Sequence, residues 1–404
     1  MSGTTAGRRF GLPAMLPRDP AEPHRAASNL ELLFDLVFVV AVSISSVTLH
    51  HLEAEGRLAE GVLGYGIVFA AIWWAWMTFT WFGTSFDTDD WLYRVTTFVQ
   101  MAGALVIAAG APAAMEHGDL TRVVIGYLIM RLAALPQWAR VAATNPGYRR
   151  TAVRYIIGIT VAQTLWLIAL VTVEATGRLW IFLPIIAIEL AVPAFAERAR
   201  ATPLHPHHIA ERFGLFTLIL LGESILASAN AIIEALDSGE HVPNLLALAV
   251  CGLIIVTTMW WTYFARPMSS RIGRGLGPAM VFGYFHYVIF AAAGAFSAGI
   301  EVAVGSFAEH GSLGVVAARA TLTVPVACFF LGVWWLALRP TLPTAASAAV
   351  VTLAAVMAAS ALLPGAAYVV ATCGVGVVLL LEATRRRAPS TSTARTEGTA
   401  AVPG

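Results

Sequence analysis

Repeated apolar stretches, each about 17 to 25 residues long, run through most of the chain and are separated by short polar loops. A helix of this length crosses a hydrocarbon core about 30 Å thick. Hydrophobic residues make up 58% of the chain and charged residues 12%, whereas soluble domains have about 25% charged residues. The sequence therefore predicts an all-α, polytopic integral membrane protein whose main partner is the lipid bilayer.

The apolar stretches predict about 12 transmembrane helices. We expect residues 29–200 to form a first six-helix repeat and residues 201–384 a second one. Residues 1–28 are expected to form a cytoplasmic N-terminal tail, and residues 385–404 a disordered cytoplasmic C-terminal tail. The expected spans are residues 30–50, 61–82, 94–115, 121–141, 152–173, 179–196, 212–235, 245–265, 279–303, 313–338, 343–363 and 365–383.

Short matching segments in the two halves indicate an internal repeat. The offset between them grows smoothly from about 180 to about 193 residues, as small loop insertions would produce. With six spans in each half, both halves enter the membrane from the same side, which makes the repeat parallel. The matching segments are Phe34–Leu36 with Phe213–Leu215, Trp73–Phe79 with Trp260–Phe264, and Glu116–Leu120 with Glu309–Leu313.

The arginines are distributed unevenly between the two sides of the predicted membrane. Basic residues favour cytoplasmic loops, so the side with most arginines is the inner side. The N-terminal tail, the loops on that side and the C-terminal tail hold nearly all of them. We therefore expect both termini to be cytoplasmic. The arginines on the outer side are only Arg57, Arg122, Arg178 and Arg319.

Several acidic residues lie where a membrane makes them costly. Glu31 and Asp35 are four residues apart at the start of the first span, so a helix places them on one face about 6 Å apart. Asp35 is a candidate ion-pathway residue, and Glu31 is more simply a helix-start or packing residue. Glu223 lies about 20 Å along the seventh span. With Asn230 and Glu234, seven and eleven residues further on, it predicts a polar stripe toward the outer face that lines a water-filled route, unless Glu223 only joins two helices. Ser224, beside Glu223, is a further candidate pathway residue.

Arg131 lies about 15 Å into the fourth span and must find a carboxylate or water. The available acids are Asp35, Glu189 and Glu223. Two prolines flank Glu189 within its span and are expected to kink or interrupt the helix, because each lacks a backbone N–H. A broken helix would free backbone carbonyls for a cation. The alternative is an ordinary kink with Glu189 facing a neighbouring helix.

Histidines and cysteines give no strong indication of a metal site. His286 lies about 10 Å deep among aromatic residues in the ninth span, where it is a candidate proton relay or a packing residue. His205, His207 and His208 lack the i, i+4 spacing of a zinc-binding histidine pair. The three cysteines are isolated in apolar runs. Motifs for nucleotides, hydrolysis or cofactors are absent, so we expect no cofactor, no metal, no nucleic-acid partner and no enzyme activity.

Two motifs resemble the signatures of a known family. LELLFDLVFV, which begins at Leu30, resembles the first-helix motif of the bacterial low temperature requirement A family, and HIAERFGL with LGESI, which begin at His208 and Leu221, resembles its second motif. The resemblance covers about residues 28 to 383 and implies a multi-pass protein of the bacterial cell (inner) membrane that is linked to growth in the cold. The motif residues are Glu31, Phe34, Asp35, His208, Glu211, Arg212, Gly214, Gly222, Glu223 and Ser224.

These observations favour a secondary transporter or channel for a small solute or ion. We expect coupling to protons through Glu223, Asp35 and Glu189, with Arg131 balancing their charge, and a cavity between the halves lined by these acids. One alternative is a non-transporting membrane protein for adaptation to cold or membrane stress. Another is a membrane-embedded enzyme acting on lipid. The sequence leaves the solute and the oligomeric state open.

Overall fold

The computed structural model describes residues 12–19, 22, 26–172, 178–239, 241–273, 276–307 and 312–386. In these ranges the chain forms long helices joined by short loops and contains no strand. The helices are α1 (Asn29–Ala54), α2 (Leu58–Phe86), α3 (Trp91–His117), α4 (Thr121–Thr144), α5 (Arg149–Thr172), α6 (Arg178–Glu197), α7 (Pro206–Ser238), α8 (Val242–Phe264), α9 (Ser269–Ile272), α10 (Leu276–Gly305), α11 (Val315–Val333), α12 (Thr344–Ala359) and α13 (Ala366–Arg386).

Within the described residues, ten helices are long and apolar enough to cross a membrane. Each expected span falls on a helix, and the two long helices outside this set of ten are α4 and α6. α11 continues through a π-helical turn, Trp334–Leu338, and α12 through a 3-10 turn, Ser360–Leu362. The multi-pass helical class is therefore confirmed. The count of 12 spans remains a prediction.

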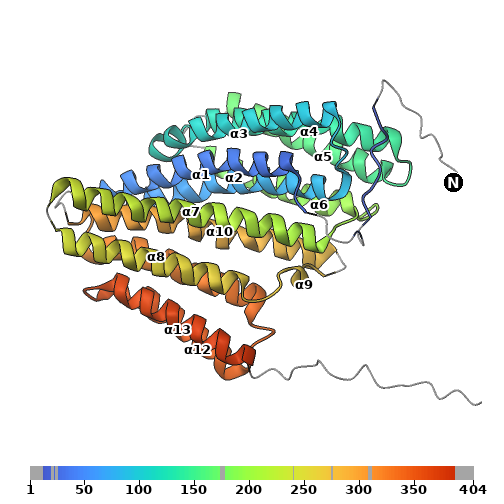
Figure 1. The fold of residues 1–404 in the computed structure, drawn as a ribbon. Helices are drawn as coiled ribbons and strands as arrows, with labels where there is room; N and C mark the ends of the chain where they lie inside the picture. Colours follow the sequence, from blue (N-terminus) through green and yellow to red (C-terminus); the bar gives the residue numbers. More distant parts are fainter. Residues whose placement is uncertain are drawn as a thin grey trace, which may run out of the picture.

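The helices lie side by side in a broad bundle (Figure 1). α3, α4 and α5 form one edge, and α12 and α13 form the opposite edge. α1 lies centrally, in contact with α2 and α3 and also with α7 and α10. α1 therefore joins helices from both halves of the sequence.

The two halves of the chain share an order of neighbouring helices. In residues 29–200, α1 packs on α2 and α3, and α3, α4, α5 and α6 pack in succession. In residues 201–384, α7 packs on α8 and α10, and α10, α11, α12 and α13 pack in succession. This shared order is what a parallel repeat predicts.

Hydroxyl groups join the two halves at the contacts of α1 and α2 with α10. Ser46 Oγ donates to the carbonyl of Gly294 at 3.1 Å, and Tyr65 OH donates to the carbonyl of Ala291 at 3.1 Å. In the other direction, Tyr287 OH donates to the carbonyl of Gly66 at 2.8 Å. Side chains that donate to the backbone of a neighbouring helix stabilise helix packing in a membrane, where water offers no alternative partner.

The described part of the predicted N-terminal tail packs against the bundle. Met15 is fully buried, and its backbone N–H donates to Thr144 Oγ1 at 3.1 Å. The backbone N–H of Arg18 donates to the carbonyl of Ser85 at 2.9 Å. Residues 12–19 therefore cover the ends of α2 and α4 on the side of the bundle where α1 begins.

α10 and α11 approach closely at Gly299, which gives a first prediction. A Cβ added at Gly299 would lie 2.6 Å from the carbonyl carbon of Thr321, a backbone atom that cannot rotate away. Gly299→Ala is therefore expected to lower the free energy of unfolding by about 1 to 3 kcal/mol. Gly305→Ala on the same helix is the control, because its Cβ would meet nothing within 4 Å. Thermal unfolding in detergent measures both, and equal midpoints would refute the close contact.

Candidate functional site

The first turn of α1 determines where Glu31 points. Ser28 precedes the helix, and its Oγ accepts a hydrogen bond from the backbone N–H of Glu31 at 3.3 Å. The Glu31 Oε2 atom accepts the backbone N–H of Ser28 at 2.8 Å, which completes a capping box. This reciprocal pair satisfies two backbone donors and holds the Glu31 carboxylate beside the start of the helix. One helical turn later, Asp35 lies on the same face.

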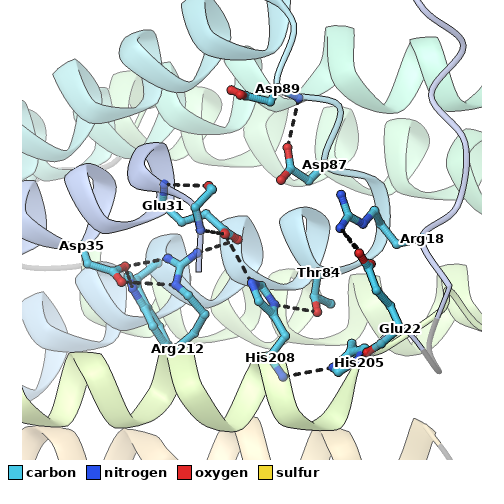
Figure 2. A network of polar contacts seen from close by, with 12 residues as sticks. Arg18, Glu22, Glu31, Asp35, Thr84, Asp87, Asp89, His205, His208 and Arg212 are labelled. Atoms are coloured by element: carbon cyan, nitrogen blue, oxygen red, sulfur yellow. Dashed lines mark hydrogen bonds and ion pairs between the residues drawn. The ribbon is translucent and has the colours of Figure 1, made fainter. Parts of the chain in front are cut away.

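Arg212 of α7 bridges these two carboxylates (Figure 2). Its Nη2 donates to Asp35 Oδ1 at 2.6 Å, and its Nε donates to Asp35 Oδ2 at 3.2 Å. Its Nη1 lies 2.8 Å from Glu31 Oε1, as an ion pair without hydrogen-bond alignment. The paired geometry on Asp35 is the strong, orientation-specific form of an arginine–carboxylate contact.

His208 lies one turn before Arg212 and completes the network. Its Nε2 is 3.3 Å from Glu31 Oε2, and its Nδ1 is 2.9 Å from the hydroxyl of Thr84 on α2. When Nε2 carries the proton and donates to Glu31, Nδ1 either accepts from Thr84 in the neutral ring or donates to it in the imidazolium. A proton on His208 therefore changes the net charge of the network without breaking its contacts.

Aromatic residues of α2 enclose the network. Trp76 Nε1 donates to Asp35 Oδ1 at 2.7 Å, and the guanidinium carbon of Arg212 lies 5.9 Å from the Trp76 ring and 5.7 Å from the Phe79 ring. Glu31 and Asp35 are each 1% exposed, and His208 and Arg212 are 0% exposed. Charges buried this deeply are tolerated only when they are paired and hydrogen-bonded. We call Glu31, Asp35, Thr84, His208 and Arg212 the charge network.

The charge network was only partly foreseen from the sequence. Asp35 was a candidate, but its cationic partner is Arg212, which the sequence marked only as a family-motif residue. Glu31 is a helix-start residue, as expected, and also a partner of Arg212 and His208. The signal that could have indicated this network is a pair of matching spacings: acids at i, i+4 in one span and bases at i, i+4 in another.

A second buried site surrounds Glu189 in the first half. Arg131 Nη2 donates to Glu189 Oε2 at 3.3 Å, so Glu189 is the acid that pairs with Arg131. Gln163 Nε2 donates to Glu189 Oε1, and Trp74 Nε1 lies 3.5 Å from Oε2. α6 is not interrupted, because Pro184 and Pro193 both lie inside one continuous helix. Glu189 therefore has side-chain donors, and the expected break in the helix is absent.

A small cavity adjoins this second site. Its volume is about 30 Å³, which is room for a water molecule. Arg131, Gln100 and Gln137 supply polar groups to its lining. Arg131 Nε and Gln100 Nε2 make no hydrogen bond to other residues that the structure describes. The polar lining is what a water molecule would require in this position.

Glu223, Ser224 and Asn230 have different surroundings, and the side chain of Glu234, the third member of the expected stripe, lies outside the described part of the structure. Glu223 is half-buried, and its polar neighbour is the hydroxyl of Ser43 on α1. Ser224 is fully buried, and its Oγ has no hydrogen bond to any described residue. Asn230 is exposed and donates to Glu301 at 3.1 Å. Glu223 therefore lies at the contact between α7 and α1, the same two helices that hold the charge network.

His286 is enclosed and uses both ring nitrogens. Nε2 is 3.0 Å from Tyr263 OH, and Nδ1 is 2.7 Å from the carbonyl of Phe282. The rings of Phe213 and Phe290 pack against it at 4.6 and 5.2 Å. This geometry favours the packing interpretation of His286 over the proton-relay interpretation.

The other motif residues have separate surroundings. The ring centroids of Phe34 and Phe79 are 3.7 Å apart, and Phe79 in turn contacts Arg212 of the charge network. A Cβ at Gly214 would lie 3.1 Å from the Phe264 ring, so a small residue favours this contact between α7 and α8. Gly222 has open space around it. Glu211 is exposed and lines an open cavity of about 560 Å³ with Arg266 and other residues near the start of α7.

In the described ranges, no group of three or more His, Cys, Asp or Glu side chains is placed to hold a metal ion. The acidic loop before α3 is neutralised instead. Arg94 binds Asp89 at 2.8 Å and holds the pKa of Asp89 below its usual range. Partial burial raises the pKa of Asp90, but hydrogen bonds from Arg140, the Tyr93 backbone and Thr88 outweigh burial and lower it.

The lowered pKa of Asp90 gives a second prediction. Its folded-state pKa lies below the unfolded value, so its stabilising contribution is present at neutral pH and is lost as pH falls through the folded pKa. Asp90→Asn keeps an N-cap but loses the charge facing Arg140, and is expected to cost about 1 kcal/mol at pH 7. When melting curves are recorded from pH 7 to pH 3, the melting temperatures of the natural protein and Asp90→Asn should converge. A constant difference would refute the ionic contribution.

The acids that were expected to line a pathway lie outside the three cavities described for this structure. The largest has a volume of about 690 Å³ and lies between α1 and the helices α8, α10, α11 and α13. We call it the outer-end cavity, because its lining includes the end of α1 opposite the charge network. Asp35, Glu189 and Glu223 line none of the three cavities. The predicted acid-lined cavity between the halves is not among them.

Comparisons with known proteins identify a family profile and a relative that match this chain. The profile described as bacterial low temperature requirement A protein matches residues 26–381, a range that includes the charge network and both sequence motifs. An uncharacterized protein of Rhizobium meliloti is 31% identical over 261 residues. The match covers 59% of this chain and 58% of that protein, so the chain spans little more than half of the relative's length.

Proposed function

Since the chain belongs to the bacterial low temperature requirement A family, we propose that it is a transporter or channel that moves a small solute or ion across the bacterial inner membrane. The observation that supports this function is the fully buried charge network between α1 and α7. Ionisable residues inside membrane helices are costly and mark substrate or proton pathways. We propose no catalytic role for the network.

The position of the charge network supports a gating role. It joins α1 of the first half to α7 of the second half, and transporters built from two repeats move one half against the other. In our proposal, both termini are cytoplasmic and the network closes the cytoplasmic end. His205 links the network to the N-terminal segment, because its Nε2 lies 2.7 Å from the carbonyl of Glu22 and its Nδ1 accepts from the His208 N–H (Figure 2).

Protons are the proposed coupling ions. A proton on Asp35 would remove one charge that faces Arg212 and weaken the attraction between α1 and α7. Glu223 lies 11 residues after Arg212 on the same helix, about 16 Å further along the axis. No ion pair is found for it among the described residues, so it is the acid of this interface most free to take up a proton.

Reconstituted protein tests this function. Liposomes loaded with a pH-sensitive dye report proton flux, and potassium flux is followed in parallel. We expect flux above empty vesicles for the natural protein and a large loss in Glu223→Gln and Asp35→Asn. Glu60→Gln is the control, because Glu60 is 63% exposed and its ion-pair partner in the described part of the chain is nearby Arg57. Absent flux, or flux unchanged in Glu223→Gln, would contradict the proposal.

A structural role without transport is the second candidate function. It is favoured by the absence of Asp35, Glu189 and Glu223 from the linings of the three cavities. In this case the charge network only joins the halves in membranes under cold or other stress. Network variants would then lower the melting temperature of the protein while vesicles containing the natural protein carry no flux.

A further inference from the structure

The outer-end cavity is lined by ends of helices from both halves. His50 and Ala54 contribute from α1, and the rest of the lining comes from the second half. Its volume of about 690 Å³ falls within the range of about 300 to 1,000 Å³ that holds small-molecule ligands. The cavity is therefore large enough for a small molecule, whereas the cavity beside Arg131 is not.

Among the described residues that line this cavity, one side chain carries a charge at neutral pH. Arg319 of α11 is half-buried, and no ion pair or hydrogen bond to another described residue is found for its guanidinium. It lies four residues after the start of α11 at Val315, about 6 Å along the axis. No described acidic side chain is part of the lining. Among the described residues, the cavity therefore offers a positive charge without an acidic partner, close to one end of the bundle.

The deeper walls of the cavity are apolar. Leu248 and Cys251 of α8, Val302 of α10 and Leu322 of α11 are each less than a tenth exposed. Cys251 lies nine residues after the start of α8, about 14 Å along the axis. A cation near the mouth and apolar walls beneath it match a ligand that has an anionic head and an apolar chain.

We propose that the outer-end cavity binds a single-chain amphiphile with a carboxylate head, which Arg319 holds while the chain lies against α8, α10 and α11. Arginine suits this head, because its guanidinium can make two parallel hydrogen bonds to one carboxylate. A two-chain phospholipid would need space for a second chain. The inference rests on the proposed transport function, for which it names a substrate class.

Binding to the purified full-length protein in a nonionic detergent tests this site. The probe is a fluorescent undecanoic acid, and palmitate, hexadecanol, acetate and phosphatidylglycerol are the competitors. We expect palmitate to displace the probe and the other three to displace it poorly. Arg319→Gln should weaken binding about tenfold or more, since a charged hydrogen bond is lost. Arg319→Lys keeps the charge but loses the paired hydrogen bonds, so its affinity should lie between those of the natural protein and Arg319→Gln.

Two further variants separate charge from space. Ala303→Phe adds bulk to the cavity lining without changing its charge and should also weaken probe binding. Arg122→Gln is the matched control, because Arg122 is exposed near the start of α4 and does not line the cavity. Unchanged binding in Arg319→Gln, equal competition by hexadecanol, or stronger competition by phosphatidylglycerol would each overturn the proposal.

The binding experiment and the flux experiment can fail independently of each other. Binding is measured at equilibrium and needs no movement of solute. Flux without probe binding would leave transport in place and refute the carboxylate amphiphile as the ligand. Arg319-dependent probe binding by the purified protein, together with no flux in vesicles that contain it, would support the site and refute transport.

Discussion

Arg212→Met is expected to lower the free energy of unfolding by about 3 to 5 kcal/mol, the usual cost of removing one partner from a buried ion pair. The variant leaves Glu31 and Asp35, both 1% exposed, without the guanidinium that lies within 3 Å of each. Methionine fills similar space, so the loss reports charge more than volume. Thermal unfolding in detergent, followed by tryptophan fluorescence, measures the effect.

Two comparisons isolate the cause of this loss. Arg94→Met removes an arginine whose side chain is 55% exposed, and a surface pair of that kind contributes little to stability because water screens it. The triple variant Glu31→Gln, Asp35→Asn, Arg212→Met removes all three charges and should be more stable than Arg212→Met alone. If Arg212→Met and Arg94→Met have the same melting temperature, the charge network contributes little to stability.

Arg131→Met is the second variant for which we expect a large loss, again about 3 to 5 kcal/mol. Arg131 is 5% exposed and Glu189 is 2% exposed. After the substitution, Gln163 and Trp74 still donate to the Glu189 carboxylate, but no cation remains beside it. The melting temperature of the purified protein should fall well below that of the natural chain.

The second site has its own controls. Arg122→Met on the same helix removes an exposed arginine and is expected to change stability little. Combining Arg131→Met with Glu189→Gln removes both charges, so the pair should recover part of what Arg131→Met loses. A double variant less stable than Arg131→Met would show that Glu189 tolerates its burial without a cation.

The position of a charged residue along the chain predicts that it needs a partner, but not which residue that partner is. The depth of Arg131 in an apolar stretch predicted that it needs an acid, and this was confirmed in Glu189. The depth of Arg131 could not predict which acid is its partner, because Glu189, Asp35 and Glu223 are all far from it along the chain. Asp35 instead pairs with Arg212, 177 residues away, through the contact between α1 and α7.

Glu223 shows a second limit of sequence reasoning. Counting residues places it deep within its span, but depth along a helix does not say which face the side chain occupies. In the fold it is half-buried beside Ser43 and does not continue into a buried stripe with Asn230. The prolines of α6 are a similar case, since neighbouring helices keep that helix continuous around them.

The sequence by itself determined the helical membrane class, the positions of the long helices and the presence of two carboxylates on one face of α1. These features follow from hydropathy and helical periodicity, which are local properties of the chain. Only the tertiary structure decided that Arg212 and His208 meet those carboxylates, and that Arg319 faces an apolar cavity. Such pairings depend on side-chain packing between helices, because in a membrane one apolar face attracts lipid as well as it attracts another helix.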